Sequence, residues 1–186
     1  MLPNADCLTS DEVCCTTLYD IANNILVGLY EAMLECYQPS FCNAGGLIAY
    51  VTMGSGDDLV YDALSVSIGS VRPSDGSVNR NAMSPFRSLL VTFDVRLIES
   101  GWPMAEVENG EIFAPDPVEQ NAIARHAYAH GERMYRKLLY MATSGGLMPQ
   151  GSACTNAVVD SLFPMNPAGG TVGWRTSVTL TLPGAV

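Results

Sequence analysis

A regular alternation of apolar and polar residues over positions 88–103 constrains the fold of this chain more than any other stretch. The apolar residues of this alternation are Val91, Phe93, Val95 and Leu97. The pattern is typical of a β-strand with one buried face, and Asp94 and Arg96 then lie on the opposite face. Pro103 has no N–H for a β-ladder and restricts Trp102 to extended geometry, so pairing should end there. We expect the central strand of an antiparallel sheet.

Two further segments carry helical signals. Thr9 and Glu12 match a capping box, and apolar residues three and four positions apart follow, which predicts a first helix from about residue 10 to about residue 36. Asp116 before Pro117 is a strong helix start, and two glycines at 145–146 should end that second helix. The predicted inner face of the second helix is Ala124, Ala127, Tyr128, Gly131, Met134, Tyr135, Leu138, Met141 and Ala142.

The remaining segments complete an α+β domain. Residues 47–53 and 59–68 read as two strands joined by Gly-Ser-Gly-Asp turn chemistry, so we expect a hairpin there, and residues 172–182 alternate as a last strand. The order is α-β-β-β-α-β in one domain over 1–186, with two helices packed on an antiparallel sheet. Long loops are expected at about 69–87 and 147–170.

Composition narrows the classes of function. Charged residues are 15% of the chain, against about 25% in typical soluble domains, which fits either a subunit buried against its neighbours or a neutral Ser/Thr/Asn surface. The net charge of −10 argues against a protein that grips nucleic-acid phosphates, although DNA could pass it without binding. No apolar run of 18 residues and no targeting segment is evident, so we expect no membrane association and synthesis in a cytoplasm.

Catalytic and metal-binding motifs are largely missing. The six cysteines contain no Cys-x-x-Cys pair and are expected to be small buried or half-buried residues; a bridge from Cys7 or Cys36 to Cys42 requires a particle outside the cell. His126 and His130 have the spacing of two metal ligands on a helix, but no third ligand is evident. Surface or interface histidines are therefore expected, with no cofactor and no metal. A clustered acidic segment, which contains Glu106, Glu108 and Glu111, reads as a solvated or lumen-facing loop.

The layout resembles a known family, the tail terminator proteins of long-tailed bacteriophages. The resemblance is carried by Phe-Asp-Val-Arg at 93–96, Gly-Trp-Pro at 101–103, Asp-Pro at 116–117 and the Gly-Gly, Trp-Arg strand at 169–182. It implies a structural virion protein without enzymatic activity, made in the host bacterial cytoplasm. Such a protein forms a ring, expected to be hexameric, at the head-proximal end of the tail tube, where it ends tube growth and joins the head connector or stopper protein. Genomic DNA passes through the ring.

On this reading, Asp94, Arg96 and Trp102 are candidate residues of the subunit interface. Asp94 and Arg96 leave the sheet on its outer face, where they meet either water or a neighbour. Trp102 stands where the strand leaves the sheet and anchors either the core or an interface. The alternatives are another neck or tube component, such as a head–tail stopper or tail tube subunit, and, as a distant third, a metal-dependent hydrolase that uses His126 and His130.

Overall fold

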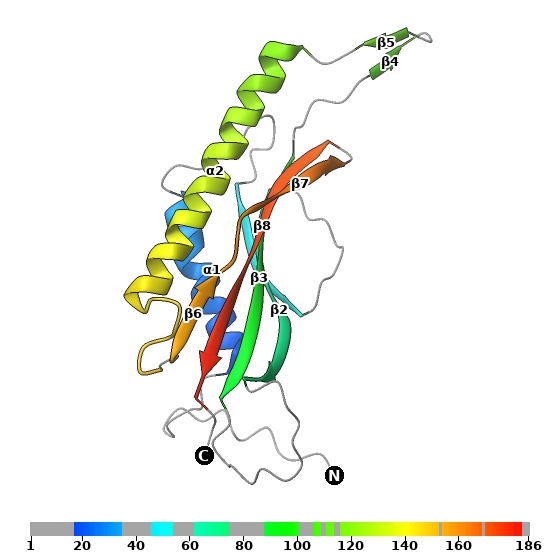
Figure 1. The fold of residues 1–186 in the computed structure, drawn as a ribbon. Helices are drawn as coiled ribbons and strands as arrows, with labels where there is room; N and C mark the ends of the chain where they lie inside the picture. Colours follow the sequence, from blue (N-terminus) through cyan, green and yellow to red (C-terminus); the bar gives the residue numbers. More distant parts are fainter. Residues whose placement is uncertain are drawn as a thin grey trace.

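The computed structural model describes residues 17–34, 46–53, 62–74, 88–100, 106–108, 111–113, 116–152, 154–168 and 170–183. Two helices and a six-stranded mixed sheet form the body of the domain, and a two-stranded hairpin stands clear of it (Figure 1). In chain order the elements are α1 (Leu18–Leu34), β1 (Ile48–Met53), β2 (Ala63–Pro73), β3 (Leu89–Ser100), β4 (Glu106–Glu108), β5 (Glu111–Phe113), α2 (Pro117–Ser144), β6 (Asn156–Val159), β7 (Phe163–Ala168) and β8 (Thr171–Leu182).

The predicted α+β class is confirmed, and β3 is the central strand. The strands follow the order β1-β2-β3-β8-β6, with β7 also paired to β8, and β3 pairs antiparallel with both of its neighbours. Both helices lie on one side of the sheet (Figure 1), α1 against β1 and β2, and α2 against β6 and β8. The apolar positions of the alternation, Val91, Phe93, Val95 and Leu97, are all 0% exposed beneath them.

The expected hairpin between the first two strands is wrong. β1 and β2 pair in parallel, with Ile48 opposite Ala63 and Met53 opposite Ile68. A parallel pair requires the chain to return along the length of β1 before β2 begins, which a tight turn cannot do. Extended chain reaches about 3.3–3.6 Å per residue, so the residues between the strands suffice to cover the roughly 20 Å of β1. The sheet is therefore mixed rather than wholly antiparallel.

The two expected long loops are shorter than predicted. β2 continues to Pro73, and the rest of the first loop, from residue 75 to 87, lies outside the described residues. The segment 147–170 contains β6 and β7, which pair one after the other with the two halves of β8. Pro164 and Pro167 hid β7 from sequence reasoning, but proline is tolerated in a strand that has a partner on one side only.

The first helix begins later than predicted, at Leu18. Thr17 is its N-cap: the Asp20 N–H donates to the Thr17 hydroxyl at 3.2 Å, and Asp20 accepts from the Thr17 N–H at 2.8 Å. The Thr17 hydroxyl also donates to the Asp20 carboxylate at 2.6 Å. This bond and the bond from the Thr17 N–H hold the pKa of Asp20 below its usual value. The box expected at Thr9 and Glu12 lies outside the described residues.

The second helix has the predicted ends. Asp116 caps it by accepting the Val118 N–H at 2.9 Å, and Gly145 ends it in the left-handed conformation at φ 76°. Its predicted inner face is right in the main, but Tyr128 is 64% exposed, and two buried residues, Ile123 and His130, were not predicted there. Tyr128 instead forms a T-shaped contact with the Trp174 ring, with 5.2 Å between the ring centroids.

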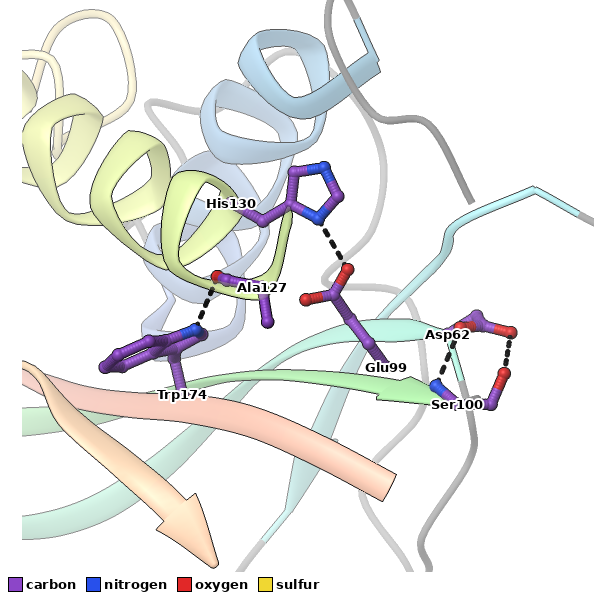
Figure 2. Close-up of polar contacts among 6 residues, drawn as sticks. All are labelled: Asp62, Glu99, Ser100, Ala127, His130 and Trp174. Atoms are coloured by element: carbon purple, nitrogen blue, oxygen red, sulfur yellow. Dashed lines mark hydrogen bonds and ion pairs between the residues drawn. The ribbon is translucent and has the colours of Figure 1, made fainter. Parts of the chain in front are cut away.

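Trp174 of β8 fixes α2 to the sheet. Its indole Nε1 donates to the carbonyl oxygen of Ala127 at 2.7 Å (Figure 2). The ring lies in the space left by Gly131, where an added Cβ would meet indole atoms at 2.5 Å. A second glycine, Gly28 of α1, faces Met141 of α2, so its close neighbour is within the same chain.

Candidate interface on the open face of the sheet

The face of the sheet opposite the helices is polar at its centre. The register places Arg96 of β3 directly opposite Arg175 of β8, and Asp94 opposite Ser177. Directly paired residues on neighbouring strands project to the same side, so all four belong to the open face. This bears out the expectation that Asp94 and Arg96 leave the sheet away from the core.

A hollow of about 510 Å³ lies on this face, where β3, β8 and the β6–β7 edge meet. Its lining residues are Asp94, Arg96, Asp160, Ser161, Phe163, Arg175, Thr176 and Ser177. The wall at Asp160 is fixed, because its N–H donates to the Ser177 carbonyl and its own carbonyl accepts from the Thr176 hydroxyl, both at 2.9 Å. The backbone at Asp160 is therefore held against β8, and this side of the hollow has a defined shape.

Two carboxylates share the hollow with the arginines, those of Asp94 and Asp160. The Asp160 carboxylate accepts from the Ser177 hydroxyl. Asp94 lies against Gly69 of β2, where an added Cβ would come within 2.7 Å of its Oδ2, and β2 changes register around that glycine. The bulge therefore accommodates the Asp94 side chain.

The side chains of the two arginines have no hydrogen-bond or ion-pair partner within the described part of the chain. Arg96 is half-buried and Arg175 is exposed. Like charges at directly paired positions disfavour a sheet, and the carboxylates of Asp94 and Asp160 in the same hollow offset part of that cost. Residues that weaken folding in this way are expected where a function compensates for them.

An exposed aromatic residue stands beside the arginines. Phe163 of β7 pairs with Arg175 and is 52% exposed. Aromatic residues and arginine are the types enriched in the centres of protein interfaces. Chemically, the hollow offers two guanidinium groups, two carboxylates and an aromatic ring, a mixture of groups suited to a polar protein contact. Sequence reasoning missed Arg175 and Phe163, because their proximity to Arg96 depends on a register that no local pattern encodes.

The remaining sequence-based interface candidate and the acidic segment lie elsewhere. Trp102 is outside the described residues. The acidic segment forms the β4–β5 hairpin, in which Glu108 pairs with Glu111. It was expected to be a loop, but it has a defined ladder of its own.

The two histidines do not converge on one site. His130 is buried, and its Nδ1 lies 2.5 Å from Oε1 of Glu99, which is 1% exposed (Figure 2). His126, one turn away, is exposed, with 6.4 Å between the two ring centroids. Of the two positions expected for these histidines, surface or interface, the surface position is wrong for His130. In the segments that the structure describes, no group of three or more His, Cys, Asp or Glu side chains could hold a metal ion.

The buried Glu99 pair belongs to the attachment of α2 rather than to the hollow. Glu99 lies on the helix side of β3, and its Oε2 has no hydrogen-bond partner among the described residues. The next residue, Ser100, donates its N–H at 3.0 Å and its hydroxyl at 2.7 Å to Asp62, at the start of β2 (Figure 2). These contacts tie the end of β3 to α2 on one side and to β2 on the other.

Comparison of the chain with models of known protein families and with curated proteins found no match. Of the helices described, neither combines the length and the apolar character needed to cross a membrane.

Proposed function

We propose that this protein is a structural, non-enzymatic subunit of a phage virion, a tail terminator that forms a ring at the head-proximal end of the tail tube. In this role it ends tube growth, joins the tail to the head connector or stopper protein, and lets genomic DNA pass through the ring. The resemblance of the sequence to that family supplies the specific role. The α+β architecture, in which both described helices lie on one side of the sheet, is compatible with it.

The observation that carries the proposal is the Arg96–Arg175 pair beside exposed Phe163, since neither arginine side chain has a hydrogen-bond or ion-pair partner within the described part of the chain. Two adjacent arginines and an exposed aromatic ring on one sheet face are what a subunit interface would explain. The low content of charged residues, 15%, fits a subunit whose surface is covered by neighbours. The net charge of −10 fits a lumen that repels DNA phosphates rather than holding them.

The test separates assembly from folding with the variant Arg96→Glu. In the isolated subunit the new carboxylate faces Arg175, so we expect the free energy of unfolding to rise by about 0.2–1 kcal/mol. Assembly should weaken, because the interface loses a cation. Light scattering after size-exclusion chromatography, and negative-stain microscopy of the protein alone and mixed with tail tubes of the same phage, report the assembly.

Arg125→Glu is the matched control, because Arg125 is exposed on α2, away from the hollow, and the change in net charge is the same. If the Arg96→Glu variant still forms full rings, the open face of the sheet is not part of the interface. Wild-type protein that stays monomeric and leaves tube ends uncapped would contradict the terminator role. Binding along tube walls or only to the connector would indicate a tube subunit or a stopper instead.

A further inference from the structure

The six-stranded sheet ends in β1 on one side and in β6 and β7 on the other. Edge strands present unpaired N–H and C=O groups, and natural proteins usually protect them with proline or charged side chains. β7 contains Pro164 and Pro167, whereas β1 and β6 contain no proline, glycine or charged residue. Both strands also expose an apolar side chain, Ile48 at 49% and Val158 at 46%. Within the described part of the chain, β1 and β6 are thus edges without the usual protection.

The direction of the unpaired backbone groups on β1 follows from one hydrogen bond. The Ile48 N–H donates to the carbonyl oxygen of Asp62 at 2.8 Å, so the backbone groups of Ile48 face β2. Backbone groups of successive residues in a strand point to alternate sides, so Ala49 and Val51 direct their N–H and C=O groups away from β2. No described residue forms a hydrogen bond with these outward groups.

β6 has the same arrangement at the opposite edge of the sheet. The Asp160 N–H donates to the Ser177 carbonyl at 2.9 Å, so the backbone groups of Asp160, and of Val158 two residues earlier, face β8. Ala157 and Val159 therefore direct their backbone groups outward. These groups too have no hydrogen-bond partner among the described residues.

The two edges are complementary in direction and in register. β1 runs parallel to β2 and to β8, and β6 runs antiparallel to β8. When copies stand side by side in the same orientation, β1 of one copy is therefore antiparallel to β6 of the next, which is the more stable pairing. A single register keeps all four residues of β6 opposite β1 and pairs outward groups with outward groups. It places Ala49 opposite Val159, and Val51 opposite Ala157.

We infer that β1 of one copy pairs antiparallel with β6 of the next copy, so that the sheet continues from subunit to subunit. Such head-to-tail contacts generate rings when the rotation between copies closes. In the stated register Tyr50 lies opposite Val158 on the open face, and the exposed Ile48 is the diagonal neighbour of this valine. The inference rests on the proposed ring function and names a subunit contact. It concerns the sheet edges, whereas Arg96→Glu tests the open face, so the two contacts can fail separately.

The location of the contact is tested with two variants that each gain one cysteine. Tyr50→Cys and Val158→Cys are purified separately, mixed and oxidised. In the inferred register the Cα atoms of these positions lie about 4.5 Å apart, which a disulfide can span. We expect a covalent dimer whose linking peptides, identified by mass spectrometry, contain both introduced cysteines. Val27→Cys in place of Val158→Cys is the matched control, because Val27 of α1 is 45% exposed, and it should give at least about tenfold less of the linked product.

Two further variants test whether the edges drive assembly. Ala49→Pro removes an outward N–H and leaves the bonds to β2, since proline is tolerated on an edge strand where the N–H faces outward. Val158→Lys places a charge on the other edge, as natural edge strands do against pairing. Each should raise the apparent dissociation constant of assembly about tenfold or more, measured by light scattering over a concentration series. Val27→Lys should assemble like wild type. Circular dichroism checks folding, and Val158→Lys carries the test if Ala49→Pro does not fold.

The other outcomes separate the contact from the ring. A mixture that links no more than its control, together with assembly of Val158→Lys like wild type, overturns the edge contact and leaves the ring intact. Dimers of Tyr50→Cys alone, linked through the introduced cysteine of both copies, would show that β1 pairs with β1 and refute the head-to-tail contact. Wild-type protein that never assembles, alone or on tubes, removes the proposed function together with the contact.

Discussion

Gly131→Ala should be the most damaging small substitution in α2. Its Cβ would lie 2.5 Å from Cε2 and Nε1 of Trp174, where heavy atoms normally stay about 3.5–4.0 Å apart. The helix or the ring must therefore move by roughly 1 Å, and the 2.7 Å bond from Nε1 to Ala127 would be lost. Overpacking and an unsatisfied buried donor, offset by the better helix propensity of alanine, give a net loss of about 2–4 kcal/mol.

Gly28→Ala is the matched control. Its Cβ would come equally near a neighbour, 2.7 Å from Cε of Met141, but that atom is the end of a flexible side chain. The methionine can rotate away, so we expect this variant to unfold within about 1 kcal/mol of wild type. Urea unfolding followed by far-ultraviolet circular dichroism measures both variants.

Gly131→Ala in a protein that lacks the Trp174 indole tests whether the indole causes the loss of stability. In a Trp174→Leu protein the obstructing ring is missing, so Gly131→Ala should become neutral or stabilising by up to about 1 kcal/mol. The reasoning is refuted if Gly131→Ala is as stable as Gly28→Ala, or if its cost is unchanged when Trp174 is replaced.

Two further predictions concern the other attachments of the helices. His130→Ala should lower the free energy of unfolding by about 3 kcal/mol, because the buried Glu99 carboxyl loses the bond at Oε1 and has no partner at Oε2. Replacing both His130 and Glu99 with leucine should lower the free energy of unfolding by less than His130→Ala does. If urea unfolding shows the double leucine variant to be the less stable of the two, the cost does not come from leaving Glu99 without its partner. Asp20→Asn should destabilise α1 at neutral pH. The bonds from Thr17 hold the pKa of Asp20 below its usual 3.8, so its contribution is complete above that value and is lost as the pH falls through the lowered pKa. The difference between wild type and Asp20→Asn should therefore shrink below about pH 4, and a difference independent of pH would contradict this.

Elements with local signals were predictable from the sequence. The ends of α2 depend on Asp116 and Gly145, whose effects operate within a few residues, and β3 is specified by its alternation. The start of α1 was misplaced because Thr17 with Asp20 is a second capping box, and sequence gave no way to rank it against the earlier one.

Features that depend on distant contacts were not predictable. The relative direction of β1 and β2 is not encoded in either strand, and the turn residues between them suggested the opposite of the parallel pairing that forms. On α2, hydropathy placed Tyr128 inward and left His130 outside. The structure reverses both: Glu99 provides a buried partner for the histidine, and Tyr128 is exposed and contacts the Trp174 ring in a T-shaped pair.

The two faces of β3 explain why the candidate interface was only half visible in the sequence. The inner face is specified by hydropathy, which any alternating strand reveals. The outer face acquires its character from register, since Arg96 becomes unusual only when Arg175 stands directly opposite. Two directly paired arginines, neither in an ion pair within the described part of the chain, make the same face a candidate contact surface although Asp94 and Asp160 lie in the same hollow. Arg96→Glu, measured beside its control Arg125→Glu, is therefore the experiment that tests this face.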